Sequence, residues 1–563
     1  MHAASPRHLR RPWSIVLPLT LGLLAAMLVT GGAMLWPTNV CWLQHADLAQ
    51  SYLGWAFYRH DPWTLPFGAT PSYGLEIHSS VYYSDSIPLL AMLLKPVAAW
   101  LPEPFQYFGP WVLACFILQA YFAWNLLSLS TDSVAARILG CLFFVAAPPM
   151  LMRLGGHMAL VAHWAILAAL YLYLRPSSKH QRGWWTVLVA ASMVIHAYVF
   201  LMVAAIWVAD VLRRLWLARH GENTSMPWRE LAREVLQVML ATAVVAWLAG
   251  FFMISSRGMQ AEGFGYYKMN LLAPFNGGGW SRFGLAFAQA DGEYEGFNYF
   301  GVGGLLLLLA GLIAGLKQAA ARQRRLWWPL VAVAVGLTLF AITPSVGLGM
   351  HEWQLPLPSW LHDRLAHSSI QATGRLFWVS YYMLLVAAIG ALARTLSTRW
   401  LVPLLGVAVL LQAIDLAPGL RNLHQLLLTR ATVDQATQLQ GPFWDDAGQR
   451  YTRLRLVPTR LLAPGWEVLA RYALEHHMGT DAIQVARADW KVFNRVRAHQ
   501  LQLLDNGTPE PQTLYVLDPS IAERVARAAH PQDAVFLLDG WRVLAPGWNQ
   551  PLPPGAVNLK PTP

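Results

Sequence analysis

The chain has 563 residues, of which 56% are apolar and only 13% are charged. Because soluble domains carry about 25% charged residues, this composition excludes an ordinary soluble protein and indicates a membrane protein. The net charge of +11 would suit a nucleic-acid partner. However, Lys and Arg lie in short clusters between apolar runs, a pattern that reflects the orientation of a protein in the membrane and argues against a nucleic-acid partner.

The apolar runs predict a mostly α fold, a polytopic helical membrane bundle of about eleven spans. We interpret the first run as a retained span rather than a cleaved signal peptide. The run 184–212 has basic residues at both ends, so we interpret it as two short helices that turn near His196–Tyr198. The predicted spans are 14–36, 106–128, 134–148, 159–174, 184–197, 198–212, 235–254, 298–316, 326–342, 374–393 and 400–417.

The basic clusters predict the orientation, because cytoplasmic loops are enriched in Lys and Arg. We expect the N-terminus on the cytoplasmic side and, with an odd number of spans, the C-terminus outside. The clusters assigned to the cytoplasm are Arg7, Arg10 and Arg11 at the N-terminus, and those at 175–182, 213–233, 317–325 and 394–399.

The long loop 37–105, after the first span, is rich in aromatic and acidic residues. Asp47 lies in the first turn of a stretch with apolar residues at helical spacing, which we interpret as an amphipathic helix on the membrane surface. Asp85 is flanked by two serines, and Glu76 lies between these two aspartates in the chain. Two convergent carboxylates would suit a general base, or a base with a divalent ion such as Mg or Mn.

Two further outer segments carry candidate ligands for a sugar phosphate. His157 and His163 flank the end of a span beside Arg153, where they would help to bind an anion. The loop 255–297 combines aromatic, amide and charged side chains, which suit the apolar faces and hydroxyls of a sugar, although an interfacial aromatic belt has the same composition. Its candidate residues are Arg257, Glu262, Tyr266, Tyr267, Lys268 and Asn276.

Arg375 lies at the predicted outer start of a span. An arginine there runs against the orientation rule, and charged residues at the membrane edge are functional hypotheses by default. Arg375 would grip a lipid phosphate through a bidentate contact, or would extend to the phosphates of the outer leaflet.

Residues 418–563 differ from the membrane domain at 1–417. The segments 513–517 and 534–538 have the composition of buried strands, and 521–529 that of a helix between them. We expect a small external α/β domain, which would be periplasmic in a bacterium.

Taken together, these residues resemble the GT-C superfamily of polytopic glycosyltransferases, in which an aspartate in the first external loop is the hallmark. The blocks DLAQSYLGWAFYRHDPWTLPFG, SSVYYSDSIPLL, GFGYYKMNLLAPFN, EGFNYFGVG and TGRLFWVSYY also resemble an uncharacterised family of bacterial membrane proteins. The superfamily resemblance implies a sugar donor carried on polyprenyl phosphate and a reaction on the outer face of the cytoplasmic membrane. It assigns the hallmark position to Asp47 and a second acidic position to Asp85.

Three functions remain open at this level. The first is an inverting glycosyltransferase that moves a sugar to a glycan, lipid or protein acceptor of the envelope. In this function Asp47, Asp85 and Arg375 would line one outward-facing cavity. The second is a transporter or flippase of lipid-linked sugars, and the third is a non-catalytic protein of envelope assembly. The absence of a WWDYG-type motif argues against transfer to asparagine.

Overall fold

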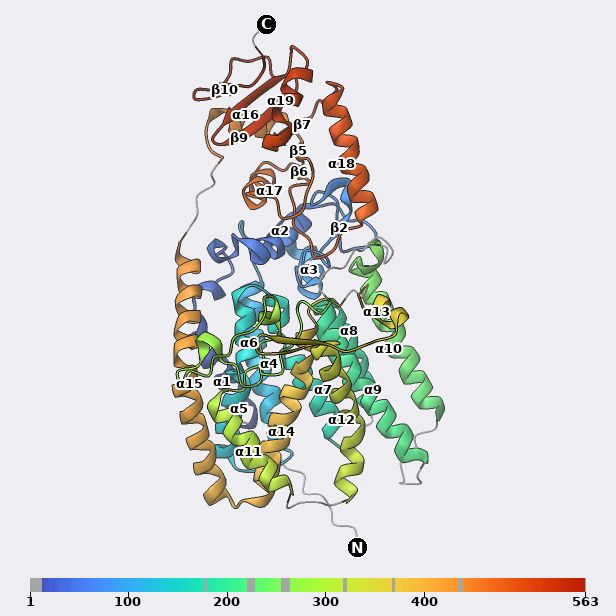
Figure 1. Cartoon of the computed structure of the whole chain (residues 1–563), viewed down its shortest axis with the longest axis vertical. Helices are drawn as coiled ribbons and strands as arrows, with labels where there is room; N and C mark the ends of the chain where they lie inside the picture. Colours follow the sequence, from blue (N-terminus) through green and yellow to red (C-terminus); the bar gives the residue numbers. More distant parts are fainter. Residues whose placement is uncertain are drawn as a thin grey trace. The chain divides into compact units, whose positions relative to one another are not determined.

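The structure is a computed structural model that describes residues 13–176, 180–219, 228–254, 264–316, 321–366, 370–433 and 439–561. It is mostly helical with a small C-terminal sheet (Figure 1). The chain divides into two compact units. The helical unit comprises residues 1–39, 107–243 and 261–431, and the mixed unit comprises 40–106, 244–260 and 432–563.

Most helices of the helical unit overlap the predicted apolar runs, whereas α13 (Ser359–Ala366) matches none of them. Within the described residues, five helical segments are long and apolar enough to cross a membrane: 108–127, 134–155, 228–248, 373–395 and 398–432. Shorter apolar helices lie at other predicted spans, so the membrane assignment holds and the count of about eleven is not confirmed. The helices are α1 (Trp13–Thr30), α4 (Phe108–Leu127), α5 (Val134–Val145), α6 (Pro148–Met152), α7 (Trp164–Leu174), α8 (Gln181–Ile195), α9 (Ala197–Arg219), α10 (Trp228–Leu248, which continues into the mixed unit), α11 (Gly301–Leu316), α12 (Ala321–Ile342), α13 (Ser359–Ala366), α14 (Trp378–Thr395) and α15 (Thr398–Thr432).

The predicted break within 184–212 is confirmed. Helix α8 ends at Ile195, His196 has extended backbone angles, and α9 begins at Ala197. The two helices pack against each other. The His196 Nδ1 atom accepts a hydrogen bond from the Tyr198 amide at 3.1 Å, which occupies one of the amides that the new helix leaves without a helical partner.

Helix α15 anchors the loop that precedes α11. The fully buried Asp415 accepts hydrogen bonds from Tyr299 Oη at 2.6 Å and from the Val302 amide at 3.0 Å. One turn earlier, Gln412 accepts a bond from the Gly304 amide. These side chains satisfy amides at the start of α11, where the helix dipole favours a carboxylate. Because α15 continues through Pro418 to Thr432, it extends beyond the predicted end of its span at 417.

The mixed unit contains the expected α/β fold. Strands lie at 513–517 and 534–538, as predicted, and a helix at 519–528 separates them. The helices are α2 (Ala46–His60), α3 (Pro88–Leu94), α16 (Pro442–Arg450), α17 (Trp466–Glu475), α18 (Trp490–Asp505) and α19 (Pro519–Ala528). The strands are β1 (Ala69–Thr70), β2 (Ser79–Ser80), β5 (Arg453–Val457), β6 (Gly479–Thr480), β7 (Thr513–Leu517), β8 (Ala534–Leu538), β9 (Trp541–Ala545) and β10 (Val557–Asn558).

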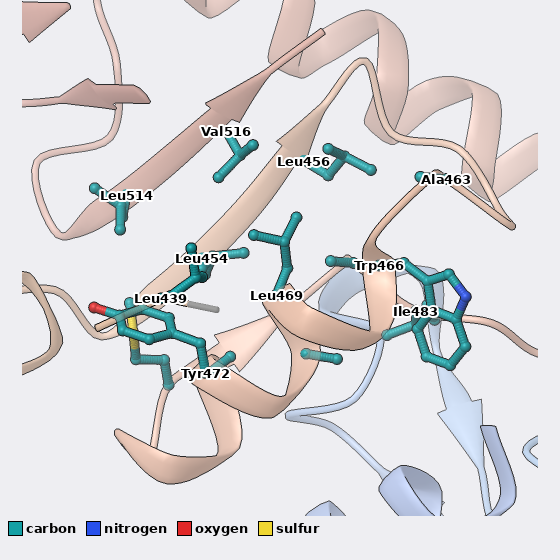
Figure 2. Packing of buried hydrophobic residues seen from close by; sticks show 14 of the residues in the cluster. Leu439, Leu454, Leu456, Ala463, Trp466, Leu469, Tyr472, Ile483, Leu514 and Val516 are labelled. Carbon is teal, nitrogen blue, oxygen red and sulfur yellow. The ribbon is translucent and has the colours of Figure 1, made fainter. Parts of the chain in front are cut away.

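The main sheet has the strand order β10-β8-β9-β7-β5-β6 and is mixed, with β6, β5 and β7 parallel. Hydrophobic clusters cover both of its faces. Tyr515 and Leu517 pack in one cluster with residues of α18 and α19. The other cluster packs against α16 and α17, and Figure 2 shows its centre, with Leu454, Leu456, Leu514 and Val516 beside Trp466 and Leu469. Burial on both faces explains the almost continuously apolar strands.

The loop 37–105 is built into this unit rather than lying on a membrane surface. Helix α2 forms as predicted, but residues on nearly all of its faces are buried, and Ala49, Leu53 and Phe57 belong to the cluster around α16 and α17. The interpretation as an amphipathic surface helix is therefore wrong. Further along the loop, Tyr73 forms a parallel bridge with Thr480, which extends the sheet beside β6.

Candidate functional site

The helical unit contains a buried cluster of two arginines and one carboxylate. Glu295 lies in the turn Glu293–Gly296, Arg375 in the turn that leads into α14, and Arg153 in the turn that follows α6. The Glu295 Oε2 atom accepts hydrogen bonds from Arg153 Nη1 at 2.5 Å and from Arg375 Nε at 2.9 Å. The His157 Nε2 atom lies 3.6 Å from Glu295 Oε1. We call these four residues the arginine cluster.

Three of the four side chains in the arginine cluster are buried. Arg153, Arg375 and Glu295 expose 2%, 8% and 7% of their side chains, whereas His157 exposes 30%. Burial alone would raise the pKa of Glu295, but the charges of Arg375 and Arg153 outweigh it and hold this pKa well below its usual range. The Glu295 carboxylate therefore stays ionised between the two guanidinium groups. The buried Arg153 Nε has no hydrogen-bond partner among the described residues. A buried guanidinium group with an unused donor is suited to an anion.

Arg153 and Arg375 lie at the ends of two candidate spans, at 134–155 and 373–395. Aromatic rings cover both guanidinium groups, since Arg153 lies 5.5 Å from the Trp378 ring and Arg375 lies 5.0 Å from the Tyr198 ring. Such cation–π contacts hold the two charges in place without neutralising them. The position predicted for Arg375 at a membrane edge agrees with this arrangement.

Two glycines set the spacing between Glu295 and Arg375. A Cβ atom on Gly374 would lie 2.5 Å from the Gly296 Cα, and one on Gly296 would lie 2.5 Å from the Lys268 carbonyl oxygen. The Gly374 amide also donates to the Tyr267 carbonyl. Three backbone segments therefore meet at a distance that only glycine permits.

We expect Gly374→Ala to lower the free energy of unfolding by about 1–3 kcal/mol, because backbone atoms must move to admit the methyl group. Thermal unfolding of the purified protein in detergent measures this. The control is Gly279→Ala, where a Cβ would meet nothing within 4 Å and where we expect a change below about 0.5 kcal/mol. Equal effects of the two substitutions would show that the junction is not tight.

The predicted sugar ligands of the loop 255–297 have mostly structural partners. Lys268 is buried and donates to Ser345 and Glu352, each at 2.7 Å. Asn276 donates to the Phe287 carbonyl and accepts from the Gly278 and Phe287 amides, so it shapes its own loop.

Tyr266 is half exposed, with its ring against that of Tyr267 at a centroid distance of 4.8 Å. It is therefore the member of the predicted set whose side chain is best placed to stack on a sugar. Arg257 and Glu262 lie outside the described residues.

Asp47 and Asp85 both lie in the mixed unit, and Asp85 contacts the helix that carries Asp47. Asp47 occupies the first turn of α2, and Gln50, one turn later, donates to Asp85 Oδ2 at 3.2 Å. Since residues three apart share a helix face, Asp47 and Gln50 point to the same side. The structure thus places both predicted acids along one face of α2.

Asp85 lies in a strained turn. Its φ is 54°, and the β-branched Ile87 has a φ of 49°, both in the left-handed region that such residues rarely adopt. The turn packs closely on α2, where a Cβ on Gly54 would lie 2.2 Å from Ser84 Oγ. Ser86 Oγ donates to the Ser51 carbonyl at 2.7 Å, which fixes the turn further. Strain of this kind is concentrated at functional sites.

Glu76, predicted as a substrate ligand, is instead held by the fully buried Arg455 of β5. The Arg455 Nη2 atom donates to both Glu76 oxygens at 2.8 and 2.9 Å, and Arg455 also pairs with Asp481 and Glu510. Burial raises the pKa of the Asp481 carboxyl to about 6, against the opposing charge of Arg455. Glu76 therefore links the loop to the sheet.

We expect Arg455→Met to destabilise the protein by about 3–5 kcal/mol, because it leaves buried carboxylates without their cation. The folded-state pKa of Asp481 is above its unfolded value, so its stabilising contribution is lost as the pH rises through about 6. The loss of stability in Arg455→Met should therefore be larger at about pH 8 than at about pH 5.

The control is Arg453→Met, two residues earlier and 46% exposed, for which chemical denaturation should show a change below about 1 kcal/mol. A small, pH-independent effect at Arg455 would contradict this role.

The predicted residues fall in both units. Asp47, Asp85 and Glu76 belong to the mixed unit, and Arg375, His157 and the described residues of the loop 264–297 belong to the helical unit. The single cavity expected for Asp47, Asp85 and Arg375 therefore stays a prediction. Among the described residues no group of three His, Cys, Asp or Glu side chains is close enough to hold a metal ion, so no catalytic step is assigned to Mg or Mn.

Sequence reasoning missed Glu295, Gln50 and Arg455. A signal for Glu295 was present, because two arginines on the side that the orientation rule disfavours require a buried counter-ion. Gln50 and Arg455 had no such signal, since their partners lie far away in the chain or in an irregular turn.

The sequence matches a described protein family over most of its length. Residues 19–417 match "Domain of unknown function (DUF6311)", and residues 443–546 match "DUF6311 C-terminal domain". No curated protein matches the chain.

Proposed function

Since the chain belongs to the DUF6311 family, whose function is unknown, we propose from its own side chains that it is an inverting membrane glycosyltransferase. It would move a sugar from a polyprenyl-phosphate donor to a glycan, lipid or protein acceptor of the envelope. The observation that carries this proposal is the arginine cluster, in which Arg153 and Arg375 both contact Glu295 and the buried Arg153 Nε has no hydrogen-bond partner among the described residues. A lipid phosphate at the membrane edge would accept a hydrogen bond from this donor.

In this reaction the Asp47 carboxylate takes the proton of the acceptor hydroxyl, whose oxygen attacks the anomeric carbon of the sugar. The bond from that carbon to the phosphate oxygen breaks, and negative charge develops on the departing phosphate. Arg375 and Arg153 stabilise this charge, while Asp85 orients the acceptor. Fixed positive charges stabilise the transition state of this step more than they stabilise the bound donor, because the negative charge on the phosphate grows as the bond breaks.

A transporter or flippase of lipid-linked sugars is the second candidate. It is favoured by buried charges on α9 and α10, where Asp210 and Glu234 are fully buried and Arg214 contacts both. Ionisable residues within membrane helices mark transport pathways in many proteins. In this network, however, each carboxylate has an arginine partner. A purely structural ion-pair network would show the same pairing.

The test is release of polyprenyl phosphate. Membranes that contain the protein are incubated with a panel of polyprenyl-phosphate sugars and an envelope extract as acceptor source, and free polyprenyl phosphate is followed. We expect release with one donor class above that from membranes without the protein. No release with any donor under conditions in which the protein is folded would contradict the proposal.

The proposed location is the bacterial inner membrane, with the N-terminus in the cytoplasm and the mixed unit in the periplasm. We expect a reporter that is active only in the cytoplasm to work when inserted at 317–325 and to fail when fused after residue 563. The basic cluster at 317–325 motivates this expectation. Activity at both positions would place the two on the same side and would separate Asp47 from the outer face.

A further inference from the structure

The helical unit contains a β-hairpin whose two faces carry different side chains. Strand β3 (Ser345–Leu348) pairs with β4 (His351–Gln354) in the register Ser345↔Gln354 and Leu348↔His351. The two-residue turn begins at Gly349, whose φ of 60° suits glycine. Because successive side chains alternate between faces, each face of the hairpin carries a distinct set of residues.

The polar face contacts the rest of the helical unit, although Glu352 stays 44% exposed and Gln354 is exposed as well. Ser345 and Glu352 both bind the buried Lys268, and Gln354 donates to Ser345 Oγ and to Glu352. Gly347 leaves space for Glu293, since a Cβ at this position would lie 2.3 Å from the Glu293 Oε1 atom. The hairpin is therefore held to the helical unit by hydrogen bonds and an ion pair.

The opposite face and the turn are exposed and mostly apolar, with His351 as the polar residue of this face. Leu348, Met350 and Trp353 expose 37%, 65% and 51% of their surface, and Val346 pairs with Trp353 on this face. A strand that faces lipid carries apolar side chains on its exposed face.

We propose that this hairpin lies in the lipid–water interface, with Leu348, Met350 and Trp353 inserted among the lipids. Only Thr343 and Pro344 separate the hairpin from α12, so it lies at the end of an apolar membrane helix. Helix α12 exposes Trp328, Val331, Val335 and Leu339 at helical spacing, which marks a lipid-facing stripe that ends just before the hairpin. Tryptophan is enriched at this interface.

The hairpin would then act as an in-plane anchor for the loop that carries Glu295. Lys268 joins the hairpin to the segment whose backbone packs against Gly296 and Gly374. The exposed apolar residues are thus linked through one buried lysine to the backbone that positions the arginine cluster. This inference concerns membrane contact and does not depend on the proposed reaction.

Spin labels in lipid vesicles test the proposal. Met350→Cys and Leu348→Cys are prepared separately with Cys41 replaced by Ser, because Cys115 and Cys141 are buried. The full-length protein is reconstituted in phosphatidylcholine vesicles, and access of each label to oxygen and to a water-soluble nickel chelate is measured. Reference labels are Val335→Cys on the exposed stripe of α12 and Asp291→Cys in an exposed loop.

We expect the hairpin labels to resemble Val335→Cys, with an oxygen-to-nickel accessibility ratio several-fold above that at Asp291→Cys. A ratio equal to that at Asp291→Cys would show that the face contacts water and would overturn the proposal. Protection from both reagents would overturn it as well, because a second copy or another protein would then cover the face. Agreement between the two label positions guards against a local effect of either substitution.

Discussion

Glu295→Gln should destabilise the protein by about 3–5 kcal/mol, the cost of removing one partner from a buried ion pair. Glutamine keeps the shape of the side chain but removes the negative charge that contacts the buried Arg153 and Arg375. Thermal unfolding in detergent measures the loss. The matched control is Glu352→Gln, which removes an ion-pair carboxylate that is 44% exposed and should cost below about 1 kcal/mol.

The same variant tests whether the arginine cluster accepts an anion. If phosphate binds beside the two guanidinium groups, polyprenyl phosphate should raise the melting temperature of Glu295→Gln more than that of the wild type, because the charge of Glu295 no longer competes with the phosphate. Equal shifts in the two proteins, or none, would leave the cluster with a structural role alone.

Asp47→Asn should reduce sugar transfer by at least about 10²–10⁴-fold while expression and membrane insertion stay normal, since the amide keeps the shape and cannot take a proton. A structural role would give a different result. Loss of a carboxylate from the first turn of α2 would cost about 0.3–1 kcal/mol in stability and would leave turnover intact.

Glu467→Gln is the control for Asp47→Asn. Its carboxylate accepts a hydrogen bond from the Ala46 amide at the start of the same helix, at 3.2 Å, and has no part in the proposed chemistry. We expect this variant to retain turnover. Near-normal activity of Asp47→Asn, or equal losses in both variants, would contradict the assignment of Asp47 as the base.

Local patterns were sufficient for the elements of the fold. Strands 513–517 and 534–538 are short apolar runs bounded by polar residues, so their burial on both faces was readable. The break at His196 followed from charges at both ends of one apolar segment. The helix at 46–60 was wrongly interpreted as a surface helix, because the side chains that bury it come from residues hundreds of positions later in the chain. The periodicity of a segment does not reveal such distant partners.

The candidate site was less readable. Arg375 stood out because it violates a rule of membrane topology, and that rule also predicts a buried partner without naming it. Glu76 and Lys268 have the residue types of sugar ligands, but each is engaged by opposite charge within its own unit. The sequence does not show whether a charged side chain has an ion-pair partner. Only the structure shows the partner, and the partner indicates whether the side chain is free to bind a ligand or has a structural role.

The most direct test of the proposed glycosyltransferase follows both ends of one donor. The purified protein is reconstituted in vesicles with an envelope acceptor and a polyprenyl-phosphate sugar that carries one isotope in the sugar and another in the phosphate. The account predicts that the two labels separate, with sugar on the acceptor and an equal amount of free polyprenyl phosphate, and that Asp47→Asn abolishes this separation. Movement of the intact donor across the membrane with both labels still joined would contradict it and would identify a transporter.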